Sequence, residues 1–417
     1  MLTPAEAARQ IVTDLAPLPP TRRPLRDALD LVLAEDVTSP IDVPAWDNSA
    51  MDGYAVRAAD VRGATTDRPI VLPVTESVPA GAVPTRSVGA GEAIRIFTGA
   101  PLPDGADSVI RQEDTDGGVD AVAVRDDRDA GRNLRRRGED IVRGAVVLSA
   151  GTQLGPAQLG VLASIAHATP LVHPAPEVAF LSSGDELVDL DQAPEILSGR
   201  RIASSNSYTI QALIRRAGAV PRDLGLARDT EESLRQHLAR AAGAHLLVTS
   251  AGVSVGEHDL VRRVLEASGG NLRFWRVAMR PGAPLGFGTL HGVPWLGLPG
   301  NPVSTMVTFE LFVRPAIRRL AGHARPFRRT VPVTLREPVT LGPRLRHFLR
   351  AVVSSPRGPD DQRDAVLTGP QGSGILTSMT KANALIIVPP DRPSVAAGER
   401  LHALLLDDTE HLAEPTF

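Results

Sequence analysis

A regular alternation of apolar runs and amphipathic segments, between Glu177 and about Gly322, is the feature that most constrains the fold of this chain. The apolar runs predict buried strands, and the segments between them have helical spacing. Such alternation is typical of a mostly parallel sheet covered by helices on both faces, so we predict a central three-layer α/β domain. We expect strands at 178–182, 245–250, 272–277 and 295–298, and helices at 207–217 (opened by Asn206), 231–241, 259–267 and 303–320.

The pattern of residue types differs on either side of this region. Between Pro40 and about Gly144, short β-branched segments alternate with Gly, Pro and Asp, which is typical of irregular β structure. Beyond Pro326 the pattern again predicts strands, so we expect a small β domain or barrel. A capping box at 3–6 predicts a helix that ends near Leu15. Further expected elements are strands at 70–74, 119–124, 331–335, 348–353 and 384–388, and a helix at 156–166.

The composition excludes several classes of site. The 417 residues include no cysteine, which rules out disulfides, thiolate metal sites and cysteine nucleophiles. Lys381 is the only lysine among 45 basic residues and is followed by Ala382, so a P-loop nucleotide site is excluded. The net charge of -3 argues against a general nucleic-acid binder. No apolar run approaches the roughly 18 residues of a membrane span, and we expect a soluble, cytoplasmic protein without a membrane or nucleic-acid partner.

Three segments rich in Gly and Ser stand where strands of the α/β region are expected to end. They are 181–186, 249–259 and 297–304. Ligands of open α/β sheets bind at the carboxyl ends of the strands, and backbone amides exposed by glycine favour anions. Any one of these segments could be an ordinary turn. Three of them together predict a site for a ligand that carries phosphate.

Acidic residues gather in or near the same segments. Asp185, Glu186 and Asp259 lie within them, and Asp229 precedes an expected helix, where it could equally be a helix cap. If these side chains met in one cleft, each like-charged pair at about 4 Å would cost roughly 4 kcal/mol at an effective dielectric constant of 20. A divalent cation would relieve that cost. Oxygen ligands without cysteine favour Mg²⁺ over zinc.

Two polar segments of the β-rich region have a distinctive composition. The segment 47–55 places small and polar residues around Tyr54, one of two tyrosines in the chain. Its alternative role is an Asx-type turn with Tyr54 as a core residue. The segment 133–140 joins three arginines to an acidic pair, and taken alone it is typical of a solvated charged turn.

Together these segments resemble the molybdopterin molybdenumtransferase family, the bacterial MoeA type that is related to the E domain of gephyrin. Seven matches occur in the order of that family and span essentially the whole chain: DNSAMDGYAVR at 47–57, IFTGAPLPDGAD at 96–107, GRNLRRRGEDI at 131–141, SSGDEL at 182–187, GVSVGEHD at 252–259, GLPGNPVS at 297–304, and QGSG at 371–374 followed by KANALIIVP at 381–389. One such motif would be weak evidence, whereas seven in order are strong.

The resemblance implies an elongated, multidomain α/β plus β protein that forms a homodimer. The implied parts are a discontinuous amino-terminal domain (1–40 and 145–175), an inserted β-rich domain (41–144), a molybdopterin-binding α/β domain (176–326) and a carboxyl-terminal β domain (327–417). In that architecture the active site is composite, because the inserted domain of the partner faces the ligand loops of the α/β domain. Contacts with a molybdopterin adenylyltransferase or with recipient molybdoenzymes are also implied.

The implied reaction inserts molybdenum from molybdate into adenylylated molybdopterin and releases AMP. The resemblance assigns catalytic roles to Asp52, Thr98, Asp140, Glu186, Asp229 and Asp259, and Mg²⁺ binding to Asp140, Glu186 and Asp259. It assigns substrate binding to Ser183, Gly184, Gly252, Ser254, Arg280, Pro299, Gly300, Asn301, Ser304, Arg350 and Ser378. Of these, Arg280, Ser304, Arg350 and Ser378 would bind molybdate, because fixed positive charge and hydroxyl donors suit a tetrahedral dianion.

The chain departs from the family pattern at several positions. Arginine stands at 276 and 280, and Ala283 at a third position, where family members usually have lysine. Arginine keeps the charge but presents a planar fork, and alanine removes the charge. Ser204 replaces a usual aspartate, and Ala251 a common glycine. These changes leave open a non-catalytic molybdopterin-binding paralogue or scaffold, and a molybdopterin adenylyltransferase is a third alternative.

Overall fold

The computed structural model describes residues 1–250, 260–342, 344–356 and 362–406. The chain divides into two compact units. The large unit comprises Met1–Arg22, Asp30–Ala34 and Leu171–Phe417, and the small unit comprises Arg23–Leu29 and Glu35–Pro170. Each unit has its own sheets and its own hydrophobic core.

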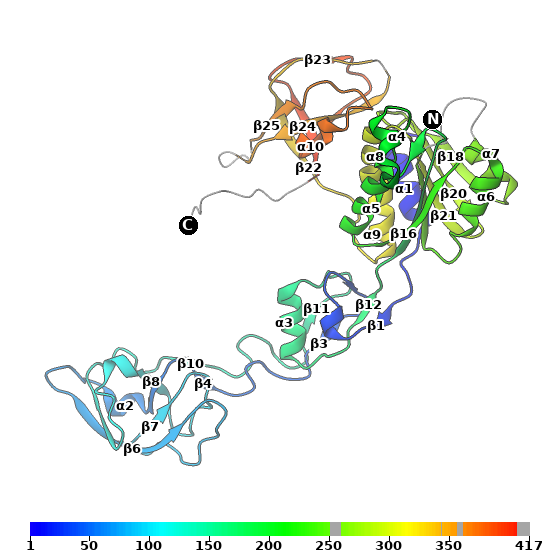
Figure 1. The fold of residues 1–417 in the computed structure, drawn as a ribbon. Coiled ribbons are helices and arrows are strands. Elements are labelled where there is room, and N and C mark those ends of the chain that lie inside the picture. Colours follow the sequence, from blue (N-terminus) through cyan, green and yellow to red (C-terminus); the bar gives the residue numbers. More distant parts are fainter. Residues whose placement is uncertain (251–259, 343, 357–361, 407–417) are drawn as a thin grey trace. The chain divides into compact units, whose positions relative to one another are not determined.

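A six-stranded sheet forms the centre of the large unit (Figure 1). The first three pairings along this sheet are parallel and the last two are antiparallel. The mostly parallel sheet expected from the sequence is therefore present, with an antiparallel edge. In spatial order its strands are β16 (Val220–Ala227), β13 (Glu177–Ser183), β17 (Leu246–Ser250), β21 (Val293–Leu298), β20 (Pro284–Leu290) and β18 (Asn271–Arg276).

Helices cover both faces of this sheet, as the alternation predicts. One face packs against α1 (Pro4–Asp14), α5 (Ser205–Arg216), α8 (Pro302–Thr308) and α9 (Arg314–Leu320). The other face packs against α6 (Glu231–Ala239) and α7 (Leu260–Ala267). Thr3 and Glu6 form the predicted capping box of α1, whose buried face adds Ala7 and Ile11 to the first core. None of the helices in the described part of the chain is long and apolar enough to cross a membrane.

Two strands of the sheet were not predicted, and each has a physical reason. The edge strand β16 contains Pro221 and Gly225 and has several exposed residues, so it lacks an apolar run. The strand β20 contains Gly286 and Gly288. A Cβ at Gly288 would lie 2.2 Å from the carbonyl oxygen of Asn271, so close strand packing requires glycine there.

The structure corrects three details of the expected helices. The helix expected at 207–217 begins at Ser205, with Ser204 at the N-cap position, so Asn206 lies inside the first turn. Asp229 does not cap α6, because Thr230 is the N-cap and its hydroxyl accepts from the amide of Ser233. The helix expected at 303–320 is interrupted by a π-helical turn at 309–313. Pro315 follows that turn, and proline cannot donate the amide hydrogen bond that a regular helix requires.

A closed five-stranded barrel forms the carboxyl-terminal part of the large unit, which confirms the expected β domain. Its buried side chains form a separate core. Going round the barrel, the strands are β24 (Arg346–Val353), β25 (Asp364–Leu367), β22 (Thr330–Leu335), β28 (Arg400–Leu405) and β26 (Ala384–Val388), which pairs again with β24. The short β19 (Met279–Arg280) pairs with β24 and so connects the barrel to the α/β region. The barrel region also contains β23 (Val339–Thr340), β27 (Ser394–Val395) and α10 (Thr377–Lys381).

The small unit is built on a five-stranded sheet. In spatial order the strands are β8 (Ser108–Arg111), β5 (Gly53–Val56), β7 (Ala93–Ile96), β6 (Ile70–Val78) and β9 (Ala121–Val124). Its other elements are β3 (Val37–Thr38), β4 (Asn48–Ser49), β10 (Leu134–Arg135), β11 (Val146–Leu148), α2 (Ala58–Val61), α3 (Pro156–Ser164) and 3-10 turns at Leu25–Asp27 and Gln112–Asp114. The remaining elements of the large unit are β1 (Thr21–Arg22), β2 (Val32–Leu33), β12 (Leu171–His173), β14 (Leu187–Val188), β15 (Ile202–Ala203), α4 (Ala193–Leu197) and a 3-10 turn at Leu190–Gln192.

Candidate active site

A cavity of about 600 Å³ lies in the large unit, beyond the carboxyl ends of the parallel strands. It is lined by the segment after β13, by β15 with the start of α5, by the first residue of β20, by the β21–α8 loop and by the barrel. The lining residues are Glu186, Leu187, Ile202, Ala203, Ser204, Ser205, Asn206, Pro284, Pro299, Gly300, Asn301, Pro302 and Gly374. Two of the predicted ligand segments and the QGSG segment therefore meet at one cavity, which has the position expected of a ligand site in an open α/β sheet.

Asn206 ties three of these segments together. Its amide nitrogen donates to Ser250 Oγ at 2.8 Å and to the carbonyl oxygen of Gly300 at 2.7 Å. The backbone carbonyl of Gly300 can only accept a hydrogen bond, so it must face the NH₂ group of Asn206, and this contact sets the orientation of the Asn206 amide. Next to it, the hydroxyl of Ser207 is 2.8 Å from Ser204 Oγ and donates to Ser182 Oγ at 3.0 Å. The ends of β13, β17 and β21 are thus joined by neutral hydrogen bonds.

Hydrogen bonds within the chain at 299–305, and others to the barrel, hold the loop at 299–304 in place. The hydroxyl of Thr305 donates to the carbonyl oxygen of Pro299 at 2.6 Å, which closes the turn that precedes α8. The amide of Val303 donates to the carbonyl oxygen of Ser373 at 3.1 Å, and Asn301 Nδ2 donates to Ser373 Oγ at 3.1 Å. Ser304, in the first turn of α8, is buried. One backbone amide at the start of α8 is therefore already paired with the barrel.

Three carboxylates lie along the edge of the sheet beside the cavity. The amide of Asp229 donates to Asp185 Oδ1 at 3.2 Å. Partial desolvation raises the pKa of the Asp229 carboxyl above its usual value, and the negative charges of Asp185 and Glu186 raise this pKa further. Gly184 has a φ of 153°, a backbone conformation that residues with a Cβ rarely adopt, so the turn favours glycine at this position. This edge of the sheet therefore carries negative charge and offers oxygen ligands for a cation.

The predicted Mg²⁺ ligands are not gathered within the described residues. Asp259 lies outside these residues, as do Gly252 and Ser254, and Asp140 belongs to the small unit. Across residues 1–250, 260–342, 344–356 and 362–406, no group of three or more His, Asp or Glu side chains is placed to hold a metal ion. The Glu186 side chain is exposed next to the cavity.

The four residues assigned to molybdate differ in accessibility. Arg280 is exposed on β19, and its guanidinium would lie 3.7 Å from a Cβ at Gly342 of the barrel. Ser304 is buried. Arg350 and Ser378 are also buried and contact each other, since Arg350 Nε donates to Ser378 Oγ at 3.0 Å.

In the small unit, Asp52 and Thr98 form a hydrogen-bonded pair. Asp52 Oδ1 accepts from the amide and from the hydroxyl of Thr98, each at 2.7 Å. These two bonds lower the pKa of the Asp52 carboxyl. The amide of Gln112 donates to the carbonyl oxygen of Asp52 at 3.0 Å, and β5 pairs with β7, so the sheet itself sets the position of the pair.

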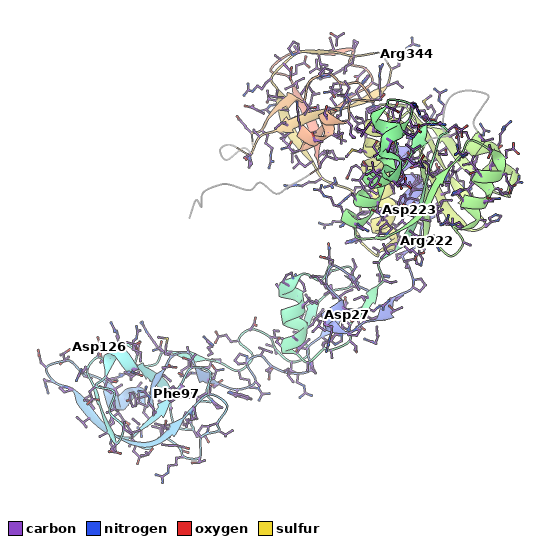
Figure 2. All side chains as sticks on the ribbon, viewed as in Figure 1. Asp27, Phe97, Asp126, Arg222, Asp223 and Arg344 are labelled. Atoms are coloured by element: carbon purple, nitrogen blue, oxygen red, sulfur yellow. The ribbon has the colours of Figure 1, made fainter. Side chains whose placement is uncertain are left out.

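The aromatic residue before Thr98 belongs to a cation–π stack. The Arg95 guanidinium lies 4.7 Å from the ring centre of Tyr54 and 5.2 Å from that of Phe97, which Figure 2 labels. Tyr54 is completely buried, and its hydroxyl donates to the carbonyl oxygen of Gly118 at 2.8 Å. The alternative role of Tyr54, as a core residue, is therefore the one that the structure shows.

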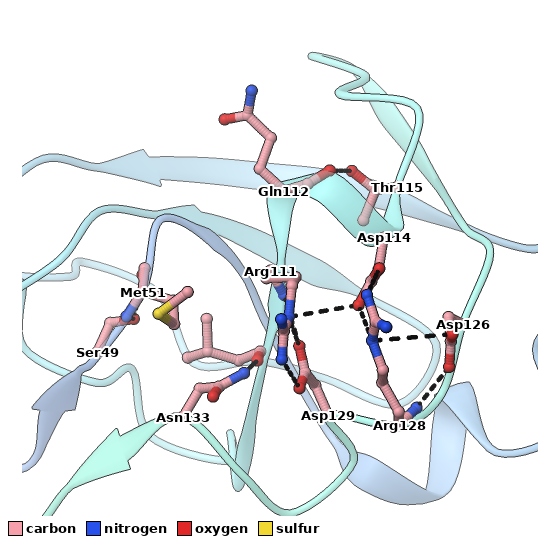
Figure 3. Close-up of polar contacts among 11 residues, drawn as sticks. Ser49, Met51, Arg111, Gln112, Asp114, Thr115, Asp126, Arg128, Asp129 and Asn133 are labelled. Carbon is pink, nitrogen blue, oxygen red and sulfur yellow. Dashed lines mark hydrogen bonds and ion pairs between the residues drawn. The ribbon is translucent and has the colours of Figure 1, made fainter.

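A network of ion pairs supports β8, the strand beside Asp52 (Figure 3). Asp129, which is 1% exposed, accepts from Arg111 Nε at 2.8 Å and from Arg111 Nη2 at 2.9 Å. Arg128 Nε donates to the buried Asp114 at 2.7 Å and lies 3.8 Å from Asp126. The hydrogen bonds from Arg111 lower the pKa of Asp129, and those to Asp129 raise the pKa of Arg111. Sequence reasoning missed this network.

Two further aspartates hold the basic segment at 135–137. Asp47 accepts from Arg136 Nη1 at 2.6 Å and from the amide of Arg137 at 2.7 Å. Asp42 accepts from Arg137 Nε at 2.6 Å. The amide of Arg143 and the guanidinium of Arg137 lower the pKa of Asp42, and the amide of Arg137 and the guanidinium of Arg136 lower the pKa of Asp47. The segment is thus a fixed structure that presents the exposed side chain of Asp140.

Comparison with known proteins relates this arrangement to one family. Three family models match the chain in order: the MoeA N-terminal region (domain I and II) over residues 3–166, a probable molybdopterin binding domain over 179–319, and the MoeA C-terminal region (domain IV) over 332–406. Molybdopterin molybdenumtransferase 2 of Mycobacterium tuberculosis is 40% identical over 389 residues, which cover 92% of this chain and 94% of that protein. The chain belongs to the MoeA family.

Other MoeA relatives agree with this membership. The molybdopterin molybdenumtransferase of Nostoc is 36% identical over 395 residues, covering 90% of this chain and 86% of that protein. The crystal structure of the molybdopterin biosynthesis moeA protein from Pyrococcus horikoshii OT3 matches with a TM-score of 0.78 at 29% identity, covering 97% of this chain and all of that one. The family resemblance and the multidomain α/β plus β fold expected from the sequence are confirmed.

Proposed function

We propose that this chain is a molybdopterin molybdenumtransferase, which inserts molybdenum from molybdate into the dithiolene of adenylylated molybdopterin and releases AMP, in molybdenum cofactor biosynthesis. The observation that supports this most directly is the cavity. Its walls combine the segments after β13 and β21 with Gly374 of the barrel, so the MoeA motifs of the α/β region and of the carboxyl-terminal region meet at one ligand-sized space.

The pterin nucleotide occupies this cavity in the proposed function. Its phosphates lie against the polar loops at the strand ends, which contribute Ser183, Gly184, Gly252, Ser254, Pro299, Gly300 and Asn301. Molybdate enters beside Arg280, whose exposed guanidinium supplies fixed positive charge, and next to the hydroxyl of Ser304. A guanidinium binds an oxyanion through two donors, so arginine at this position retains the charge that the family's lysine supplies.

The acidic groups act at the phosphoanhydride. An oxygen nucleophile, either water or an oxo group of molybdate, attacks the anhydride phosphorus, the bridging P–O bond breaks, and AMP leaves. Where water is the nucleophile, Asp52, kept ionised by its two bonds from Thr98, accepts a hydrogen bond from that water and orients it. In the proposed homodimer, the partner's small unit contributes Asp52, Thr98 and Asp140.

Mg²⁺ fits the chemistry of the donor set. Burial is the main cause of the raised pKa of Asp229, and the negative charges of Asp185 and Glu186 raise it further. A divalent cation would relieve that repulsion, and carboxylate oxygens are the ligands that Mg²⁺ prefers. Glu186 and Asp140, together with Asp259, would hold the ion, with substrate phosphates as further ligands. When bound, Mg²⁺ would neutralise charge that develops on the phosphates. Asp229 is not one of these ligands and keeps the catalytic role that the family resemblance assigns to it.

The test measures AMP released from adenylylated molybdopterin in the presence of molybdate and Mg²⁺. The natural chain should release AMP, and Asp52→Ala and Glu186→Ala should each reduce the rate by about 100-fold or more. Asp67→Ala is the matched control, because Asp67 is an exposed aspartate of the small unit outside the site. Binding of the pterin nucleotide without AMP release in the natural chain would favour the scaffold. Consumption of ATP with unmodified molybdopterin would favour an adenylyltransferase.

A further inference from the structure

Arg95, on strand β7 of the small unit, carries a positive charge close to Asp52. The pairing of β7 with β5 places Arg95 opposite Tyr54, which follows Asp52 by two positions. The two hydrogen bonds from Thr98 are the main reason for the lowered pKa of the Asp52 carboxyl, and the charge of Arg95 lowers this pKa further. Both residues lie in the described part of the chain, and their side chains form no ion pair with each other. The two charges are therefore neighbours that do not neutralise one another by direct contact.

Two aromatic rings and one side-chain amide hold the guanidinium of Arg95. It lies 4.7 Å from the ring centre of Tyr54 and 5.2 Å from that of Phe97, and Nη2 donates to Oε1 of Gln112. Ring contacts use the flat face of a guanidinium, whereas its N–H groups point outward in the plane of the group. Among the described residues, the amide oxygen of Gln112 is the only hydrogen-bond acceptor for the five N–H groups of Arg95. The group is thus held in place while most of its donors remain available.

Other arginines near this sheet have carboxylate partners. Arg111 donates to Asp129 through Nε at 2.8 Å, and Arg128 donates to Asp114 through Nε at 2.7 Å. Arg95 has no such partner among the residues that the structure describes, although its side chain is half-buried. A half-buried cation without an anion has lost part of its hydration, and a bound anion offsets that cost. The surroundings of Arg95 therefore favour an anionic ligand.

We infer that Arg95 is a further substrate-binding residue, whose guanidinium donates to phosphate oxygens of adenylylated molybdopterin beside the point at which Asp52 acts. The inference rests on the proposed function, in which the partner's small unit supplies Asp52 to the phosphoanhydride. Because Arg95 and Asp52 belong to one pair of strands and its adjoining turn, whatever brings Asp52 to the substrate also brings Arg95. The planar fork of a guanidinium matches two oxygens of one phosphate, and a fixed cation there stabilises the charge of the departing AMP.

Arg95→Gln tests the inference because glutamine removes the charge and the fork of donors. In the full-length protein without molybdate, the Kd for adenylylated molybdopterin should rise about tenfold, since one charge-assisted phosphate contact is lost. Isothermal titration calorimetry measures this Kd. Arg68 is an exposed arginine of the same unit, so Arg68→Gln is the matched control and should leave the Kd within about twofold of the natural value. An unchanged Kd in Arg95→Gln would overturn the inference.

The pH dependence of AMP release separates contact with the substrate from an action through Asp52. If Arg95 served only to keep Asp52 ionised, Arg95→Gln would move the acid limb of the rate profile to higher pH and leave the Kd unchanged, which would contradict us. We expect the raised Kd at every pH between 6 and 8. If the natural chain binds adenylylated molybdopterin but releases no AMP, the proposed function fails, and the comparison of Kd values still decides whether Arg95 binds this ligand.

Arg95→Lys provides a second variant in case Arg95→Gln does not fold. Lysine keeps the positive charge and can lie against the ring of Tyr54, but it offers a single ammonium in place of the planar fork. The Kd for adenylylated molybdopterin should therefore rise less than in Arg95→Gln, by about threefold. A folded Arg95→Lys that binds as tightly as the natural chain would show that the fork of donors does not contact the phosphate, and would refute the inference.

Discussion

The two units hold their polar side chains by different forces. Around the cavity of the large unit, the strand ends are joined by neutral groups, such as the contacts of Asn206 with Ser250 and Gly300. In the small unit, ion pairs hold the segments beside Asp52, with Arg111–Asp129 the most buried example. A neutral network depends little on pH or salt, whereas a network of carboxylates and guanidinium groups requires the carboxylates to be ionised.

This difference suits what each unit presents. In the proposed function the cavity accepts a ligand with negative phosphates, and the neutral donors and backbone groups of its loops suit that ligand, with Glu186 as the charged residue of the lining. The small unit presents single carboxylates, such as Asp52, which must be ionised and held at fixed positions. Its arginines and hydroxyls lower the pKa values of neighbouring carboxyls, as they do at Asp129 and Asp52.

The largest expected effect concerns acid stability, and it sharpens the comparison because the units should weaken in different pH ranges. Burial, and secondarily the charges of Arg318 and Arg314, lower the pKa of His323 in the large unit from 6.5 to about 4. The unfolded chain therefore takes up this proton at a higher pH than the folded one. Stability is fully present above about pH 6.5 and is lost between about 6.5 and 4, by on the order of 3 kcal/mol.

The carboxyls of the small unit lose their contribution in the same direction, on acidification, but at lower pH. Hydrogen bonds lower the pKa of Asp129 in the folded state, so its stabilising contribution is present above the unfolded value of about 3.9 and is lost only as the pH falls below it. The large unit contains Trp275 and the buried Trp295, so urea unfolding followed by tryptophan fluorescence in a Trp46→Phe background reports on this unit. In His323→Asn, the free energy of unfolding of the large unit should depend less on pH between 6.5 and 4. His402 is exposed, and His402→Gln is the control. If the free energy of unfolding changes equally with pH in the natural chain and in His323→Asn, this account is refuted.

The second prediction breaks the ion-pair network of the small unit. Asp129→Ala removes the acceptor for the backbone amide, Nε and Nη2 of Arg111 and should destabilise the unit by about 2–3 kcal/mol. Asp126→Ala removes an exposed ion pair of 3.8 Å and one exposed hydrogen bond of 2.9 Å from the amide of Arg128, and should destabilise the unit less, by about 1 kcal/mol or below. Hydrogen exchange of β5 and β8 amides measures both. A small effect of Asp129→Ala would show that the sheet, and not the ion pairs, holds this surface.

How far the sequence predicts this molecule depends on whether a residue's role is local. The strands β13 and β17 follow from apolar runs, and the loop after β13 from its glycine and hydroxyls, because those signals lie in neighbouring residues. The edge strand β16 has no apolar run, and it exists only because β13 offers a partner. Pairings between distant segments have no such local signal.

Arg350 illustrates the same limit at the candidate site. Family resemblance places it with molybdate, and its position among Phe348, Leu349 and Ala351 in an apolar strand could have indicated burial. Its N–H groups, however, donate to the backbone carbonyl oxygens of residues 370–372. Every residue has a carbonyl group, so the sequence does not indicate which of them accept these bonds. The pairing of Asp52 with Thr98 was better anticipated, since both belong to motifs of one family.

The third prediction tests the neutral network of the large unit. Asn206→Ala leaves the carbonyl oxygen of Gly300 without its side-chain donor and should destabilise the large unit by about 1–2 kcal/mol. The loss should not depend on pH between 5 and 8, because no charged group is involved. Ser205→Ala, at the neighbouring position of α5, is the matched control and should have an effect below about 0.5 kcal/mol. Urea midpoints at several pH values measure both, and a loss that grows on acidification would contradict the neutral account.

The smallest expected effect is on the titration of a single carboxyl in the small unit. Thr98→Val keeps the backbone amide that donates to Asp52 and removes only the hydroxyl donor. Loss of one bond to the charged form should raise the pKa of Asp52 toward its ordinary value, without changing the stability of the unit measurably. NMR titration of the Asp52 carboxyl measures the shift. Thr66→Val, at an exposed position of the same unit, should leave that titration unchanged. A pKa of Asp52 that does not move in Thr98→Val would mean that the backbone amide alone keeps the carboxyl ionised, and that the hydroxyl of Thr98 is free to bind the substrate.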